Sequence, residues 1–191
     1  MSDVSNHTPS ESDLIQACIA GDRQMQEILY KKYSSKMYGV CLRYCGNTDD
    51  ANDLLQEGFI KIFKNLGKFR GEGSFEGWIR RIFVNTSIEH FRKKVKLYNV
   101  SEVQENTIED TELNILDSLA EKDILALINE LSPGYKTVFN MHVIEGYSHK
   151  DIAELLGITE GTSKSQLARA KGVLKKSLES RTKKSNDIIN L

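Results

Sequence analysis

The segment 148–176 holds the pattern most specific for a function, and the chemistry that it predicts is recognition of DNA. Ser148 and Asp151 have the spacing of a capping box that starts a short helix, and Gly157 opens a turn before a longer, basic helix. In a helix-turn-helix, the first residues of the second helix enter the major groove, where cations and amides bind base edges. The residues expected to do so are Thr162, Lys164, Ser165, Gln166, Arg169 and Lys171. An ordinary amphipathic helical hairpin is the alternative.

A second pattern, over residues 69–94, places aromatic rings among cations after a glycine-rich loop. This pattern is typical of single-stranded DNA binding, because bases stack on rings while the phosphate backbone follows positive charge. The candidate residues are Phe69, Arg70, Phe75, Trp78, Arg80, Arg81, Asn85, Arg92 and Lys93. For any one of the aromatic side chains, however, a place in the hydrophobic core is the better explanation.

A third pattern is a row of carboxylates, Asp50, Asp53 and Glu57, spaced i, i+3 and i+7 on one side of a predicted helix. Paired carboxylates can hold a divalent metal or act as acid and base, so a nucleic-acid-processing enzyme is one hypothesis. No histidine or cysteine accompanies the row. A single-helix row of this kind is more typical of a solvated face or of a surface that docks a basic partner.

Other signals point away from an enzyme and away from a membrane. The sequence contains no GxxxxGKS/T, GxGxxG, HExxH or GxSxG motif. Three cysteines, an odd number, predict core residues in a reducing cytoplasm. His142 and His149 flank a helix break, which disfavours a zinc site. No apolar run approaches the ~20 residues of a membrane span. We therefore expect a cytoplasmic protein without catalytic residues, cofactor, metal or membrane insertion.

The elements that must position these residues are predicted to be helices throughout. Apolar residues recur at three- and four-residue spacings, and only two prolines occur in 191 residues, which disfavours a turn-rich β fold. Gly21 and Gly46 are expected to end helices, and Thr48 to cap the next one. Predicted helices cover 12–20, 22–45, 48–66, 75–94, 133–144, 149–156 and 160–179.

The distribution of charge divides the chain. Residues 95–130 contain 2 basic and 9 acidic residues, whereas basic residues cluster in 79–96 and 161–185. Two basic patches beside an acidic connector suggest two contacts with nucleic acid, although solvated helix faces would give the same pattern. We predict an all-α protein with two small helical domains. Its parts are a flexible N-terminus 1–11, a helical domain 12–94, an acidic linker 95–117, a helix-turn-helix domain 118–180 and a tail 181–191.

Taken together, the three patterns resemble those of the extracytoplasmic-function group of bacterial RNA polymerase sigma factors, within the sigma-70 family. The resemblance covers residues 12–94 and 119–179. Residues 50–59 look like the polymerase-docking motif of that family, residues 69–86 like its promoter-melting segment, and residues 147–165 like its C-terminal helix-turn-helix. Each motif alone is moderately specific, and all three in this order are highly specific.

The resemblance implies a division of labour between partners. Core RNA polymerase would be bound by the docking motif, through Asp50, Asp53, Gln56, Glu57 and Phe59. The candidate residues of 69–94 would bind the melted minus-ten element of promoter DNA, and those of 162–171 the duplex minus-thirty-five element. The acidic linker would lie in the active-site and RNA-exit channels of the polymerase. An anti-sigma factor is a further partner that the resemblance suggests, and nothing in the sequence identifies one.

The sequence departs from the family pattern at several positions. Asn52 replaces a usual acid and Gly58 a small or branched residue, which could weaken docking. Gln166 stands where arginine is common, so adenine is favoured over guanine. Ser163 replaces a common valine, a minor loss of packing. The main rival hypothesis is a stand-alone helix-turn-helix regulator that uses 1–94 for sensing or dimerisation.

Overall fold

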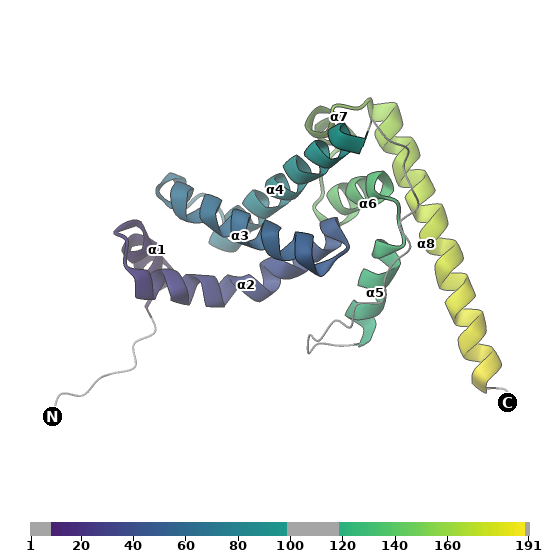
Figure 1. Cartoon of the computed structure of the whole chain (residues 1–191), viewed down its shortest axis with the longest axis horizontal. Coiled ribbons are helices and arrows are strands. Elements are labelled where there is room, and N and C mark those ends of the chain that lie inside the picture. Colours follow the sequence, from purple (N-terminus) through teal and green to yellow (C-terminus); the bar gives the residue numbers. More distant parts are fainter. Residues whose placement is uncertain (1–8, 99–118, 190–191) are drawn as a thin grey trace. The chain divides into compact units, whose positions relative to one another are not determined.

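The computed structural model describes residues 9–98 and 119–189, and within these ranges every regular element is a helix, as predicted (Figure 1). The elements are α1 Glu11–Ile19, α2 Arg23–Cys45, α3 Thr48–Asn65, the short η1 Leu66–Lys68, α4 Phe75–Tyr98, α5 Leu119–Asn129, α6 Pro133–Phe139, η2 Asn140–Ile144, α7 His149–Leu156 and α8 Glu160–Ile189. None of the described helices is long and apolar enough to cross a membrane.

The chain divides into two compact units. The first unit comprises Met1–Cys41 and Asn52–Thr86, and the second comprises Leu42–Ala51 and Ser87–Leu191. Helices α2, α3 and α4 therefore contribute residues to both units. The predicted linker 95–117 lies outside the described residues, apart from its first four positions, which belong to α4. The predicted domain boundaries stay a prediction.

The first unit is built on apolar residues that α2, α3 and α4 bury against one another. Its fully buried side chains include Leu29 and Met37 of α2, Ile62 of α3 and Phe83 of α4. Two ring contacts show how the helices meet. Phe59 of α3 lies 4.6 Å from Tyr30 of α2 and 5.4 Å from Phe83, between ring centroids. Burial of these rings supplies the main free energy that holds α2, α3 and α4 together.

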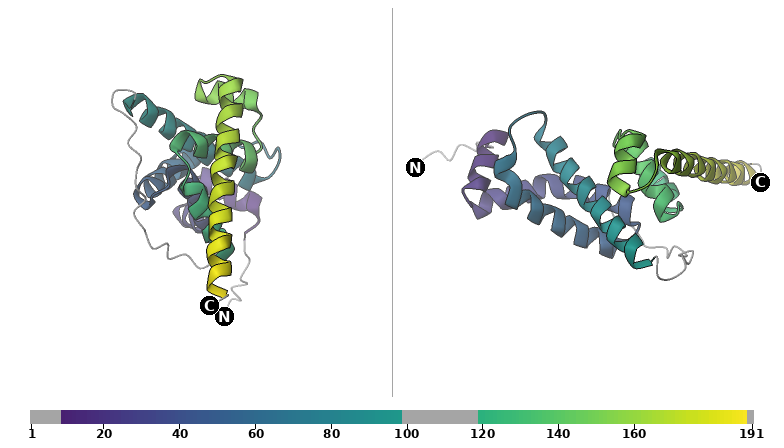
Figure 2. Two further views of the ribbon diagram at one scale, coloured as in Figure 1. Left: turned by 90° about the vertical axis from the view of Figure 1, so that its right-hand side faces the viewer. Right: turned by 90° about the horizontal axis from the view of Figure 1, so that it is seen from above.

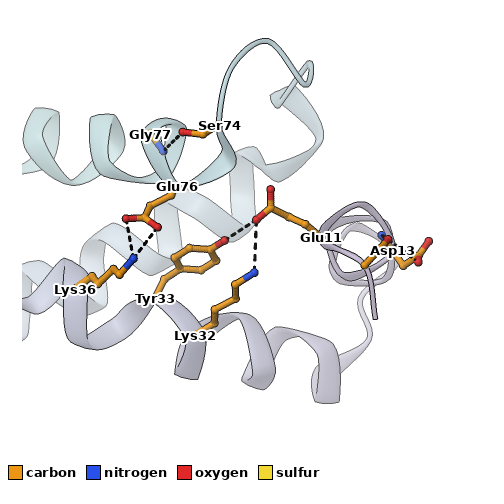
Figure 3. A network of polar contacts seen from close by, with 9 residues as sticks. Glu11, Asp13, Lys32, Tyr33, Lys36, Ser74, Glu76 and Gly77 are labelled. Carbon is orange, nitrogen blue, oxygen red and sulfur yellow. Dashed lines mark hydrogen bonds and ion pairs between the residues drawn. The ribbon is translucent and has the colours of Figure 1, made fainter. Parts of the chain in front are cut away.

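Polar contacts attach α1 to this core (Figure 3). The Tyr33 hydroxyl of α2 donates to Glu11 of α1 over 2.9 Å, and Lys32 Nζ lies 3.5 Å from the same carboxylate. Burial and the neighbouring Glu11 raise the pKa of Tyr33, so its hydroxyl stays a donor. On the other side, Lys36 of α2 pairs with Glu76 of α4 at 2.9 Å. These contacts fix the start of α4, which carries the predicted DNA-melting residues.

The helix ends follow local sequence signals with one exception. Gly21 and Gly46 adopt positive φ angles of 87° and 79° and end α1 and α2, as predicted. The prediction that Thr48 caps α3 is wrong. Asn47 caps this helix, because its Oδ1 accepts the backbone N–H of Asp50 over 2.8 Å. Thr48 is instead the first helical residue.

The second unit differs from the predicted helices at several places. Helix α5 and residues 95–98 of α4 lie where no helix was predicted. The helix expected over 133–144 ends its α geometry at Phe139 and continues as the wider π turn η2, in which Glu145 N–H bonds to the Asn140 carbonyl. The last helix, expected over 160–179, runs unbroken to Ile189 (Figure 2), so the segment predicted as a tail is mostly helical. Arg181 supports this extension through a 2.6 Å ion pair with Glu130.

Candidate nucleic-acid interface

Helices α7 and α8 form the predicted helix-turn-helix. Ser148 Oγ accepts the Asp151 N–H over 3.1 Å, and the Asp151 carboxylate accepts the Ser148 N–H over 3.2 Å, which completes the capping box. The Ser148 hydroxyl also donates to the Asp151 carboxylate over 2.6 Å, and this bond together with that from the Ser148 N–H lowers the pKa of Asp151. Gly157 ends α7 with a φ of 68°, and Thr159 caps α8 by accepting the Thr162 N–H over 3.0 Å. The turn is therefore fixed at both ends by local hydrogen bonds.

Burial on the inner face of α8 sets which of its residues face outward. Leu167 and Ala170 are buried, and α8 packs against α6 and α7 on this side. The predicted residues Lys164, Ser165, Arg169 and Lys171 are exposed, and Thr162 and Gln166 are half-buried. The outward face thus carries cations and small polar groups, as a helix that enters a DNA groove requires.

Five of these side chains already have contacts within the protein. The Thr162 hydroxyl lies 2.9 Å from the Thr159 hydroxyl, and the Ser165 hydroxyl donates to the Thr162 carbonyl over 2.9 Å. Lys164 lies 3.8 Å from Glu160 on the same helix, and both are exposed. Arg169 donates to the Tyr135 hydroxyl over 3.3 Å. The Gln166 amide lies beside Gly134, where an added Cβ would stand 3.6 Å from its Nε2. Gln166 therefore touches the start of α6 as well as facing the exposed side of α8.

The predicted residues of 69–86 lie in the loop before α4 and on α4 itself. Phe69, Phe75 and Trp78 form a ring cluster with centroids 5.0 to 5.8 Å apart. Phe75 is buried, as the core explanation for a single aromatic anticipated, whereas Phe69 and Trp78 are half-buried. Gly71 and Gly73 have positive φ angles in this loop, which residues with a side chain rarely adopt. The loop and the ring cluster are thus a built feature of the first unit.

The cations and amide predicted for this interface differ in exposure. Arg70, Arg81 and Asn85 are exposed, whereas Arg80 is half-buried. Further along α4, in the part that belongs to the second unit, Arg92 and Lys93 are exposed. Exposed cations on one helix provide the positive charge that a DNA strand follows.

The predicted docking motif occupies the first half of α3. Asp53 and Gln56 are exposed, Glu57 is half-buried beside Lys61 at 3.0 Å, and Phe59 is buried. Gly58, noted above as a departure, is required by packing, because an added Cβ would lie 2.1 Å from the Phe83 ring. The surface of this motif is therefore acidic and amide-bearing, and its apolar residues face the core.

Asp50 has partners within the second unit. Its carboxylate lies 3.0 Å from Lys94 Nζ and accepts the Asn47 side-chain amide over 3.0 Å. Burial alone would raise the pKa of Asp50, but the hydrogen bonds from Asn47 and Lys94 outweigh it and hold the pKa below its usual value. Among the described residues, no group of three or more histidine, cysteine or carboxylate side chains is arranged to hold a metal ion.

Two contacts near the helix-turn-helix were not anticipated from the sequence. Ser163 was expected only to pack slightly less well than the valine common at this position. It is completely buried, and its hydroxyl lies 2.9 Å from His149 Nδ1. The His149 ring stacks on His142, with centroids 4.3 Å apart and planes 13° from parallel. The cysteines matched expectation better, because Cys18 and Cys41 are buried core residues.

The fold and the exposed face of α8 define a class: an all-helical DNA-binding protein with a C-terminal helix-turn-helix. Comparison with known proteins refines it. The family model described as Sigma-70 region 2 matches residues 29–96, and the one described as Sigma-70, region 4 matches residues 121–174. The chain belongs to the sigma-70 family of RNA polymerase sigma factors, in its extracytoplasmic-function group.

Curated relatives align over nearly their whole length. The RNA polymerase sigma-H factor of Pseudomonas aeruginosa is 28% identical over 181 residues, which cover 88% of this chain and 94% of the relative. The ECF RNA polymerase sigma-E factor of Haemophilus influenzae is 28% identical over 182 residues, covering 89% and 96%. Among solved structures, the sigma factor RpoE of Bartonella quintana in complex with the anti-sigma factor NepR is 22% identical, with a TM-score of 0.49 and coverage of 80% and 96%.

Proposed function

We propose that this sigma factor binds core RNA polymerase through α3, binds the melted minus-ten element through the loop 69–74 and α4, and binds the duplex minus-thirty-five element through α8. The observation that carries the proposal is the pairing of region 2 and region 4 matches with an exposed basic start of α8. The exposed basic face alone would not separate a sigma factor from other helix-turn-helix proteins.

At the minus-thirty-five element, the exposed side chains of α8 would make the contacts. Lys164, Arg169 and Lys171 supply charge for phosphates or guanine edges, and Ser165 and Thr162 supply hydroxyls. Gln166 would bind adenine once its amide turns from Gly134 toward the groove. Arg169 is exposed, and its hydrogen bond with the Tyr135 hydroxyl is 3.3 Å long, so little would be lost when this side chain binds DNA.

At the minus-ten element, the exposed members of the predicted set would contact the strand. Trp78 and Phe69 have half-buried rings on which bases could stack. The exposed side chains Arg70, Arg81 and Asn85 lie near them in the sequence. Phe75 would have a different role. Its ring is buried and supports the neighbouring ring of Trp78 rather than stacking on a base. Arg80, Arg92 and Lys93 complete the proposed set along α4.

At the polymerase, Asp53, Gln56 and Glu57 would face a basic partner surface, while buried Phe59 holds the helix in place. Asp50 would join them only by sharing its carboxylate with Lys94. We further propose that the chain acts in the cytoplasm without catalytic chemistry of its own. An anti-sigma partner remains a prediction from the family.

The polymerase contact is tested by a charge reversal. We expect Asp53→Lys to abolish recovery of the chain with bacterial core RNA polymerase, because an exposed lysine would repel the basic surface that the proposal requires. Asp123→Lys, a matched reversal on α5, should bind normally, and circular dichroism should show both variants folded. Normal association of folded Asp53→Lys with core polymerase would refute the proposed docking surface.

A further inference from the structure

The two histidines beside the helix-turn-helix form one contact between three elements. The π turn η2 carries His142, α7 begins at His149, and the first turns of α8 contain Ser163. The imidazole rings stack face to face, 4.3 Å apart between centroids. The wide turn at η2 makes this possible, because it changes the direction in which residues after Asn140 project from the helix.

The hydrogen bonds of the pair specify how protons are held. His142 Nδ1 lies 2.9 Å from the Tyr147 carbonyl, which can only accept, so this nitrogen carries a hydrogen. His149 Nδ1 lies 2.9 Å from the hydroxyl of Ser163, a completely buried side chain. In a neutral His149 with hydrogen on Nε2, Nδ1 accepts the hydroxyl hydrogen. Protonation of Nδ1 reverses this hydrogen bond, so that Nδ1–H donates to Ser163 Oγ and the buried hydroxyl hydrogen loses its acceptor, which costs free energy.

The charges around His149 also favour its neutral form. Burial lowers the pKa of His149 below its ordinary value of 6.5, and His142 from η2 with Lys164 and Lys171 from α8 add to this effect. Glu160 of α8 acts in the opposite direction.

We propose that His142 and His149 are positioning residues that hold the first turns of α8 in the geometry for reading DNA, and that they do so while His149 is neutral. The stack fixes α7 against η2, and the His149–Ser163 hydrogen bond fixes α8 against α7. Protonation of His149 loosens residues 160–165, which precede and include proposed DNA contacts.

The consequence for DNA rests on the proposed function of α8. Protonated histidines add positive charge, which strengthens sequence-independent attraction to phosphates. A loosened α8 instead weakens contacts with particular bases. Acidification should therefore lower the ratio of promoter binding to non-promoter binding, rather than binding as a whole.

The pair itself is tested without DNA, by nuclear magnetic resonance of the labelled full chain from about pH 8 to about pH 5.5, the range of imidazole titration. We expect the His149 ring to titrate over this range, and the backbone amides of Thr162 and Ser163 to shift with the same midpoint. His149→Gln should remove the amide step, and Ser163→Ala should reduce it while the His149 ring still titrates. His90→Gln, a histidine on α4, is the matched control and should leave it unchanged.

Titration of the His149 ring without a response of the Thr162 and Ser163 amides would overturn the proposal. Thermal unfolding at pH 8 shows whether His149→Gln is folded, and His142→Gln provides a second variant that breaks the stack from the other side. Loss of the amide step in either folded variant supports the proposal.

The effect on DNA binding is measured with holoenzyme reconstituted from this chain and core polymerase. Its affinity for a promoter fragment that the holoenzyme transcribes is compared with its affinity for a non-promoter fragment at fixed salt. The wild-type ratio should fall by at most about tenfold per pH unit for one linked proton, and His149→Gln should flatten the slope. A slope equal in wild type and His149→Gln would contradict the role in DNA reading. Absence of promoter-dependent transcripts at every pH would instead refute the proposed function. The nuclear magnetic resonance titration would still test whether the two histidines position α8.

Discussion

At the scale of single residues, the exposed cations of α8 are the groups on which promoter recognition should depend most. Lys164 and Arg169 are exposed on the outward face, and their contacts within the chain are long. Binding DNA therefore breaks little that the free protein has formed. A bidentate contact to a base contributes about 1–3 kcal/mol, whereas a phosphate contact contributes mainly salt-dependent affinity.

We expect Lys164→Ala and Arg169→Ala each to weaken holoenzyme binding to a promoter with an intact minus-thirty-five element, by about 1–3 kcal/mol if a base contact is lost. Titration at several salt concentrations separates the two kinds of contact, because loss of a phosphate contact reduces the salt slope by about one. Lys175→Ala, an exposed lysine later on α8, is the matched control. An unchanged affinity and slope would remove the substituted residue from the interface.

Lys136 is a buried cation that lowers the stability of the folded protein. Its side chain is buried, and Nζ donates to the Asn129 side-chain oxygen over 3.1 Å. Burial, with a smaller effect from Lys94, lowers its pKa to about 8, although Cys45 acts in the opposite direction. The folded state therefore binds the proton less tightly than the unfolded state does. Lys136 destabilises the fold below pH 8, and this cost disappears as the pH rises from about 8 to 10.5.

We expect Lys136→Met to raise the free energy of unfolding at neutral pH by about 1–3 kcal/mol, because the pKa shift measures the penalty of the buried charge and the lost hydrogen bond offsets part of it. The advantage of the variant over wild type should shrink between pH 8 and 10.5. Comparison with wild type is needed, because burial raises the pKa of Cys45 to about 12 and destabilises the fold above pH 9. Denaturant unfolding across pH measures this, with Lys175→Met as control, and an equal or lower stability of folded Lys136→Met would contradict it.

At the scale of elements, close packing of α3 against α4 depends on the absence of a side chain at position 58. The Phe83 ring is completely buried and has no space to move away from an added Cβ. Gly58 thus lets the docking helix approach α4, and its departure from the family pattern is explained by packing within the first unit. Forcing an extra methyl group into a filled core typically costs about 1–3 kcal/mol.

We expect Gly58→Ala to destabilise the protein by about 1–3 kcal/mol in denaturant unfolding. The control is Gly39→Ala in α2, where nothing lies within 4 Å of an added Cβ and alanine should stabilise the helix by up to about 1 kcal/mol. Opposite signs for the two substitutions are the expected result. A Gly58→Ala protein as stable as wild type would show that α3 and α4 do not pack as described.

The elements also show which features sequence reasoning could reach. The capping box of Ser148 and Asp151 was predicted because it depends on residues three positions apart. The π turn was not, because a bond from Glu145 to Asn140 is set by packing rather than by a local signal, and the stacking of His142 on His149 follows from it. For the same reason the sequence could not decide between core and DNA contact for Phe75, which only burial resolves.

At the scale of the whole molecule, the chain combines matches to two regions of one family with an exposed surface suited to each proposed partner. A stand-alone regulator would need the helix-turn-helix but not an acidic docking helix or a ring cluster beside a glycine loop. The residue assignments for polymerase, minus-ten and minus-thirty-five contacts remain predictions of the account. Their common requirement is that neither the chain nor core polymerase alone initiates at a promoter.

Run-off transcription tests that requirement most directly. Purified chain is mixed with bacterial core RNA polymerase and genomic promoter fragments, with each protein omitted in turn. We expect specific transcripts only when both proteins are present, and their loss with Asp53→Lys. Tight binding of the chain to duplex DNA without polymerase, together with no transcript from the complete mixture, would contradict it and would favour a stand-alone regulator.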